Sequence, residues 1–160
     1  MLAIGYHYIR DQKEESEAIK PFDITTFENQ LDYLNANYYL PTVQEFIERS
    51  KEKKPFPANW FLLTFDDGLK DHFLNVFPLL KKKKMWGIFF IPTKPLVENT
   101  FLCTFFNHYF IEKYGSEEAF ILVNEIIESN TLKFNKNNFD SLLKNFSSNK
   151  VLFLKKLFNS

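Results

Sequence analysis

The chain has 160 residues, of which 45% are hydrophobic and 18% aromatic, so it has the composition of a globular protein with a substantial core. Basic and acidic residues number 20 each, which gives a formal net charge of zero. A neutral chain has no global field that attracts nucleic acid or an acidic membrane, so we expect neither as a partner. Because Cys103 is the one cysteine, an internal disulfide and a cysteine-based zinc site are excluded.

The amino terminus does not have the features of a signal peptide. Residues 1–8 contain no basic leader and no cleavage site of small residues, and Arg10 and Asp11 follow at once. No apolar run approaches the roughly 20 residues that a membrane helix needs. The sequence therefore predicts a cytoplasmic protein with no membrane span, and it does not indicate an oligomeric state.

The first part of the chain predicts strands that alternate with helices. Three short apolar and aromatic segments predict strands: residues 2–9, 61–65 and 86–92. Sequences typical of a capping box predict helices that begin at Thr25 and at Thr42, and residues 69–84 predict a third helix, with Pro78 as its start or a kink. This order predicts parallel strands with crossover helices, which is an α/β fold.

The character of the chain changes at about residue 96, where proline and glycine nearly vanish. A helix is predicted to begin at Ser116 and to run to Glu128. Weaker helical patterns cover residues 104–113, 138–146 and 149–158. The sequence thus predicts two parts, an α/β part over residues 1–95 and a helical part over residues 96–160.

Two adjacent carboxylates interrupt the apolar character of the chain at the end of the predicted central strand. The run that begins at Phe61 stops at Asp66, Asp67 and Gly68. Catalytic groups of α/β folds lie at the carboxyl ends of parallel strands. Neighbouring anions repel each other, so each needs a partner or a metal. These residues are therefore the first candidates for a functional site; the alternative is that they cap the following helix.

The segment Thr64–Gly68, which reads T-F-D-D-G, resembles the first motif of the polysaccharide deacetylases. These hydrolases share the NodB homology domain and resemble carbohydrate esterase family 4. They remove acetyl groups from N-acetylated sugars. The P-L-L of residues 78–80 and the I-F-F-I-P of residues 88–92 resemble the segments that follow in that family. Over residues 1–95, the resemblance implies part of a distorted (β/α) barrel of the NodB type. It further implies hydrolysis of a non-peptide carbon–nitrogen bond, a carbohydrate substrate and a divalent metal, zinc.

Transferred by position, the resemblance implies that Asp66 is the general base and that Asp67 is a metal ligand. The family completes its metal site with two histidines in an H-x-x-x-H motif, which this sequence lacks: its histidines are His7, His72 and His108. The later arginine-proline and leucine-histidine motifs are also absent. Two hypotheses follow. The chain is a truncated deacetylase, or it is a catalytically inactive fragment or accessory module that binds carbohydrate or a partner.

His7 is the histidine that the fold is expected to bring to the acids. It lies in the first predicted strand, and the ends of parallel strands gather at one edge. We therefore expect it within reach of Asp66 or Asp67, as a substitute metal ligand or an orienting partner, with packing as the alternative. His72 lies on the following predicted helix, where a role near the rim of the sheet is the less favoured alternative. His108, in an aromatic segment, is predicted to serve packing.

Overall fold

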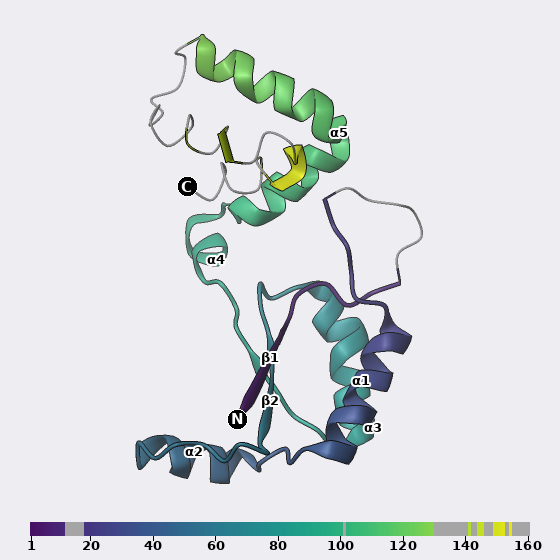
Figure 1. The fold of residues 1–160 in the computed structure, drawn as a ribbon, viewed down its shortest axis with the longest axis vertical. Helices are drawn as coiled ribbons and strands as arrows, with labels where there is room; N and C mark the ends of the chain where they lie inside the picture. The colour runs from purple at the N-terminus through teal and green to yellow at the C-terminus, as the bar shows by residue number, and fades with distance from the viewer. Residues whose placement is uncertain are drawn as a thin grey trace. The chain divides into compact units, whose positions relative to one another are not determined.

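The computed structural model describes residues 1–11, 18–100, 102–129, 141, 144–145, 149–152 and 154. The chain forms two compact units: the first comprises residues 1–13 and 21–92, and the second comprises residues 14–20 and 93–160. The first unit contains the sheet, and the helices of the second unit follow it in the chain (Figure 1). The predicted domain assignment, with a deacetylase-like part over residues 1–95 and a helical part over 96–160, remains a prediction.

The first unit is built on a small parallel sheet with the order β1–β2–β3. Its strands are β1 (Leu2–Tyr6), β2 (Phe61–Phe65) and β3 (Ile88–Phe89). The register pairs Leu2 with Phe61 and Phe65 with Phe89, and all strands run in the same direction. The predicted α/β class with parallel strands is confirmed. β1 and β3 are shorter than predicted.

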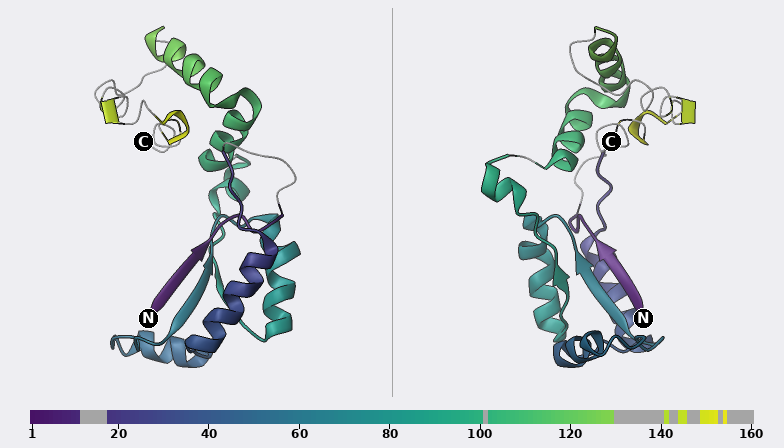
Figure 2. Two further views of the ribbon diagram at one scale, coloured as in Figure 1. Left: turned by 45° about the vertical axis from the view of Figure 1, so that its right-hand side comes forward. Right: turned by 90° about the vertical axis from the view of Figure 1, so that its left-hand side faces the viewer.

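Helices connect these strands, as parallel pairing requires. They are α1 (Ile24–Asn37), α2 (Val43–Lys51), the π-helix η1 (His72–Val76) and α3 (Phe77–Lys83). α1 and α3 lie side by side, and α2 lies at the end of the sheet where the strands begin (Figure 2). Ion pairs join the two adjacent helices, since Glu28 of α1 meets Lys82 and Lys83 of α3 at 3.1 and 3.4 Å.

The two predicted capping boxes have different outcomes. At α2 the box is confirmed: the Thr42 hydroxyl accepts from the Glu45 N–H, and the Glu45 carboxylate accepts from the Thr42 N–H. At α1 the prediction is wrong, because the helix begins at Ile24 and its cap is Asp23, which accepts from the Thr26 N–H at 2.8 Å. A carboxylate two residues before Thr25 provides the cap, so the predicted threonine lies inside the helix.

One hydrophobic core joins the sheet to the helices α1 and α3. Its buried members come from all of these elements and from the connecting segments: Tyr6, Ile9, Phe27, Leu31, Leu34, Phe61, Leu63, Phe65, Val76, Leu80 and Met85. Alternate residues of β2 belong to this core, which is the period of a strand. Phe65 stacks on Tyr6 of β1 and on Phe89 of β3, with ring centroids 5.5 and 4.8 Å apart. Burial of each large side chain contributes about 1.5–3 kcal/mol.

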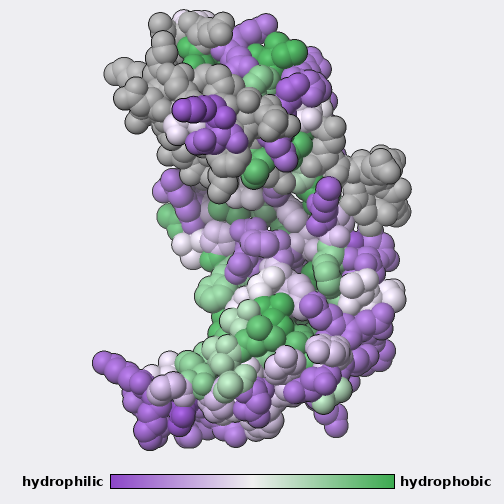
Figure 3. All heavy atoms as spheres, in the orientation of Figure 1, coloured by the Kyte–Doolittle hydropathy of each residue, from purple (hydrophilic) through white to green (hydrophobic). Residues whose placement is uncertain are grey.

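Part of the apolar surface of the first unit stays exposed. Hydrophobic side chains gather over the strands on the face shown in Figure 3. Leu2 of β1 is 41% exposed, and Phe90, which follows β3, is 54% exposed. β1 and the segment that directly follows β3 therefore carry solvent-exposed hydrophobic groups.

The second unit is helical in its described part. It contains α4 (Lys94–Glu98) and α5 (Cys103–Glu128), which is interrupted at Gly115, where φ is 74° and ψ is 159°. The interruption separates two helical stretches, in agreement with the patterns predicted before and after this glycine. A small cluster of Ala18, Ile111, Ala119, Val123 and Leu154 forms its core. Within the predicted helical ranges 138–146 and 149–158, the structure describes residues 141, 144–145, 149–152 and 154, and all of these except Asn149 are helical. The rest of these two predictions lies outside the described residues. No helix in the described part is long and apolar enough to span a membrane.

Candidate active site

The carboxyl ends of all three strands meet at one shallow concavity. It has a volume of about 390 Å³ and is lined by His7, Asp66, Asp67, Phe90, Ile91 and Pro92. Each strand supplies the residues that directly follow it, so β1 contributes an imidazole, β2 two carboxylates and β3 an apolar wall. Ligands of parallel α/β sheets bind at this edge. The two acids therefore lie at the carboxyl edge of the parallel sheet, as predicted from the sequence.

The chain turns away from the sheet directly at the two acids. The Asp66 N–H donates to the Tyr6 carbonyl at 3.0 Å, which continues the pairing of β2 with β1 by one bond. Asp67 and Gly68 then adopt left-handed backbone angles, with φ of 73° and 60°. Such angles are uncommon outside glycine, although aspartate tolerates them better than most residues. A side chain on Gly68 would also approach Cγ2 of Ile91 to 3.3 Å.

The two carboxylates are partly exposed and are directed at a histidine. The side chain of Asp66 is 38% exposed and that of Asp67 is 23% exposed. The helical residues that follow begin at Lys70. The contacts of the two carboxylates are with the imidazole of His7, at 4.0 and 3.0 Å, rather than with the backbone of this helix.

The structure brings His7 to both acids, as predicted. Its Nδ1 lies 3.0 Å from Oδ2 of Asp67, and its Nε2 lies 4.0 Å from Oδ2 of Asp66. Because an ionised carboxylate only accepts hydrogen bonds, the Nδ1–H of His7 donates to Asp67. The imidazole is 57% exposed, so it faces the concavity rather than the core. Packing is thereby excluded as its main role.

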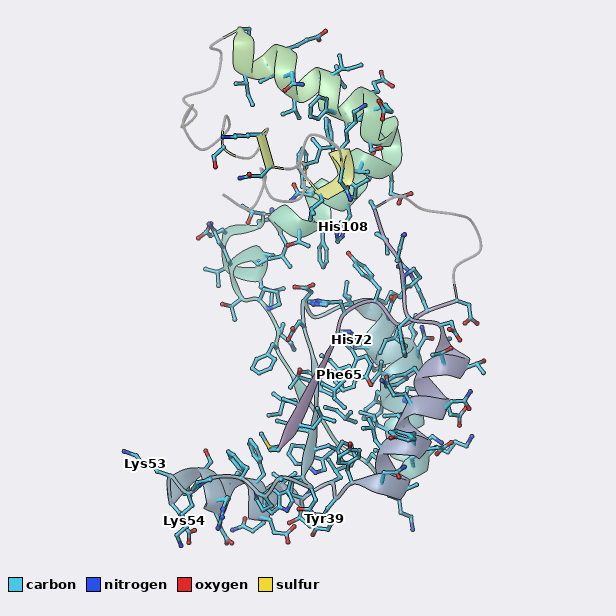
Figure 4. The ribbon with its side chains drawn as sticks, in the orientation of Figure 1. Tyr39, Lys53, Lys54, Phe65, His72 and His108 are labelled. Carbon is cyan, nitrogen blue, oxygen red and sulfur yellow. The ribbon has the colours of Figure 1, made fainter. Side chains whose placement is uncertain are left out.

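Sequence reasoning gave a role of His72 near the rim of the sheet only as the less favoured alternative, and it did not single out Asn75. The Nε2–H of His72 donates to the carbonyl of His7 at 2.8 Å, and the Nδ2–H of Asn75 donates to the carbonyl of Ile9 at 2.7 Å. The ring of His72 also packs against Phe65 with centroids 5.5 Å apart (Figure 4). The feature of the sequence that could have indicated these two donors is their spacing. His72 and Asn75 are three positions apart on one helix, and Asn75 is next to Val76, which is buried. His108 lies in the second unit.

The charges around the site affect a neighbouring tyrosine. Burial raises the pKa of Tyr8, and the negative charge of Asp67 raises it further, while Arg10 acts in the opposite direction. Arg10 lies over the Tyr8 ring at 5.0 Å and 3.7 Å from Asp71. Tyr8 therefore keeps its phenolic proton in the neutral pH range, and its hydroxyl group stays a potential hydrogen-bond donor.

The described residues do not form a complete metal centre. Carboxylate and imidazole are ligand types that zinc accepts, and Asp66, Asp67 and His7 supply both. Among the residues that the structure describes, however, no group of three or more such side chains is arranged to hold a metal ion. A catalytic zinc normally takes three protein ligands. This part of the chain therefore offers an incomplete ligand set.

Comparison of the sequence with known proteins finds no matching family model. Two similar proteins are both poly-beta-1,6-N-acetyl-D-glucosamine N-deacetylases. The protein of Escherichia coli (strain K12) is 28% identical over 81 residues, which are 50% of this chain and 12% of that protein. The protein of Staphylococcus epidermidis is 30% identical over 112 residues, which are 62% of this chain and 38% of that protein. The chain thus spans much less than two thirds of these relatives.

Similar solved structures have partial overlap with the chain. IcaB from Ammonifex degensii is 28% identical with a TM-score of 0.47, over 56% of this chain and 37% of that one. The deacetylase PplD of Streptococcus pyogenes is 18% identical with a TM-score of 0.49, and the match covers 67% of this chain and 50% of that one. The de-N-acetylase of Aggregatibacter actinomycetemcomitans is 22% identical with a TM-score of 0.44, and the match covers 55% of this chain and 36% of that one. The curated relatives confirm the resemblance predicted from the T-F-D-D-G segment: part of this chain is similar to polysaccharide deacetylases.

Proposed function

We propose that this chain contributes part of the active site of a hydrolase that removes acetyl groups from an N-acetylated sugar or glycan. The observation that supports this proposal is the meeting of Asp66, Asp67 and His7 at the carboxyl edge of a parallel sheet. Similarity to two poly-beta-1,6-N-acetyl-D-glucosamine N-deacetylases favours the same reaction class. In this proposal the three strands are part of a distorted (β/α) barrel of the NodB type.

Asp66 is the proposed general base. Its carboxylate is 38% exposed and has His7 only at 4.0 Å, so it remains accessible to a water molecule. A base in this position would take a proton from the water that attacks the acetamido carbonyl. The apolar wall formed by Phe90, Ile91 and Pro92 faces the same concavity and would contact the substrate.

Asp67 is the proposed ligand of a divalent metal, zinc by preference, and His7 is either a second ligand or the partner that orients Asp67. A bound metal would polarise the acetamido carbonyl and lower the pKa of a coordinated water. The described ligand set is incomplete, so further ligands would have to come from residues other than the described ones. Truncation of the chain and a cytoplasmic location likewise remain proposals.

Acetate release from N-acetylglucosamine oligomers, measured with and without added zinc or cobalt, tests the reaction. Removal of the base by Asp66→Asn should lower the rate by about 10²–10⁴-fold. Glu48→Gln is the matched control, because it removes a carboxylate from α2, at the end of the sheet where the strands begin (Figure 2). Equal rates for the wild type and Asp66→Asn would refute the assignment of the base.

A second candidate function is a carbohydrate- or partner-binding module without catalysis. It is favoured by one observation, the absence of a three-ligand metal group among the described residues. Calorimetric titration with zinc or cobalt separates the two functions. Micromolar binding that Asp67→Ala abolishes favours the enzyme. Absence of metal binding, together with oligosaccharide binding that Phe90→Ala weakens, favours the module.

A further inference from the structure

The segment that carries His7 is held from two sides after it leaves the sheet. The paired register of β1 and β2 ends at Tyr6 and Phe65, and the turn at Asp67 follows, so residues 7–9 lie beyond the paired part of the sheet. On one side, the Phe22 N–H donates to the Tyr8 carbonyl at 2.9 Å. The carbonyls of an extended segment alternate in direction, so those of residues 7 and 9 point to the other side.

Side chains from a helix replace the missing strand on that other side. His72 donates to the carbonyl of His7 at 2.8 Å, and Asn75 donates to the carbonyl of Ile9 at 2.7 Å. The donors are three positions apart in η1, and the acceptors are two positions apart in the extended segment. All three carbonyls of residues 7–9 therefore have a hydrogen-bond donor, although only one of these donors is a backbone group.

The ring of His72 is fixed in one orientation and one tautomer. The residue is 4% exposed, and its ring lies against Phe65 and Phe89 at centroid distances of 5.5 and 5.9 Å. A carbonyl only accepts, so Nε2 must carry a proton. Nδ1 is buried, and among the described residues it has no hydrogen-bond partner. Packing alone would be satisfied by a phenylalanine, so the imidazole adds a specific donor.

We propose that His72 and Asn75 are positioning residues for His7. They fix the backbone that carries the exposed imidazole, so that its Nδ1–H meets Asp67 and its Nε2 faces Asp66. Without these donors the segment keeps its hydrogen bonds to Phe22. The carbonyls of residues 7 and 9 lose theirs, so the peptide groups on either side of His7 are less constrained and the imidazole loses its alignment with the acids. The importance of this alignment for catalysis rests on the proposed function, whereas the alignment itself does not.

Long-range ¹H–¹⁵N spectra of the histidine rings test this proposal without a requirement for activity. The chain has three histidines, so assignment is simple. At a pH of about 9, an ordinary imidazole is neutral. We expect the Nε2–H pattern for His72 and the Nδ1–H pattern for His7. The latter is diagnostic, because an imidazole exposed to water prefers the Nε2–H form.

Two substitutions separate positioning from packing. His72→Gln keeps a donor near the place of Nε2, and His72→Phe keeps the ring without the donor. We expect the Nδ1–H pattern of His7 to persist in the glutamine variant and to be lost in the phenylalanine variant. The signals of His108, in the second unit, are the internal control and should not change. An unchanged His7 pattern in His72→Phe would overturn the proposal.

Asn75→Ala provides an independent test if the phenylalanine variant does not fold. It removes the donor to Ile9 and should weaken the Nδ1–H pattern of His7, and a folded Asn75→Ala protein with the wild-type pattern would refute the joint role. The result is separable from the proposed function. Failure to release acetate leaves the tautomer prediction intact, while an active enzyme with a mobile His7 ring refutes only the positioning role.

Discussion

Substitution of Gly87 by alanine should destabilise the sheet from the β3 side. A Cβ at this position would lie 2.7 Å from Cε2 of Phe65 and 3.0 Å from the carbonyl oxygen of Leu63. Favourable contacts between carbon atoms are about 3.5–4.0 Å, so an overlap of roughly 1 Å must be relieved. The Leu63 oxygen belongs to the backbone of the central strand. Phe65 is fully buried and stacks on Phe89 at 4.8 Å, so its ring has little room to move.

The expected loss of unfolding free energy follows from these overlaps. Overpacking of a core costs about 1–3 kcal/mol. Alanine restricts the unfolded chain more than glycine does, which offsets about 0.4–1 kcal/mol of that cost. The net destabilisation by Gly87→Ala is therefore about 1–2 kcal/mol. The unfolding free energy of small proteins falls by about 1–3 kcal/mol for each 1 M of urea, so the urea concentration at the unfolding midpoint should fall by about 1 M.

Tryptophan fluorescence during urea unfolding measures this effect. Both tryptophans of the chain, Trp60 and Trp86, belong to the first unit, so the signal reports the unfolding of the sheet. Gly5→Ala in β1 is the matched control, because its Cβ would only reach 3.4 Å from Oγ1 of Thr64. The control should change the free energy by less than about 0.5 kcal/mol. Equal midpoints for Gly87→Ala and Gly5→Ala would refute the steric reasoning.

Three further predictions use the same unfolding assay. Thr42→Ala removes a helix cap and should cost about 1 kcal/mol, whereas Thr25→Ala, inside α1, should not destabilise; equal losses would contradict the cap assignment. Asp67→Gly should be more stable than Asp67→Ala by about 1 kcal/mol, because φ is 73° and both variants lack the carboxylate; the reverse order would argue against strain. Burial raises the pKa of Tyr6 from 10.0 to about 12, so the unfolded chain deprotonates first, and stability should fall as pH rises from about 10 to about 12. Tyr6→Phe should reduce this fall, and the part that remains should come from groups such as Tyr8, whose pKa is also raised. A fall of equal size in that variant would assign all of it to other groups.

The position of the two acids was predictable from the sequence, because the signal is local. An apolar run that ends in Asp66 and Asp67 has few structural explanations other than the carboxyl edge of a sheet. The proximity of His7 followed from one further rule, that parallel strands end at the same edge. The extent of β1 was not predictable in this way. It ends at Tyr6 because its partner β2 ends at Phe65, and the sequence of β1 does not contain that information.

The roles of His72 and Asn75 were not predictable, because their partners are distant in the sequence. They donate to carbonyls 65 and 66 residues away. A polar residue on a helix indicates a donor but not the backbone atom that receives its hydrogen bond. The start of α1 illustrates a different limit. Asp23 and Thr25 both satisfy the local preferences for a cap, and only the backbone conformation before the helix decides between them.

Under the proposed function, the separate origin of each wall of the concavity has a consequence for the evolution of substrate specificity. The ionisable groups come from the ends of β1 and β2, whereas the apolar side consists of Phe90, Ile91 and Pro92 after β3. Residues of this short tail can therefore be exchanged for larger, smaller or polar ones while the acids and the imidazole keep their backbone supports. Under the proposed function, substitutions at these three consecutive positions would change which substrates fit the concavity and would leave Asp66, Asp67 and His7 in place.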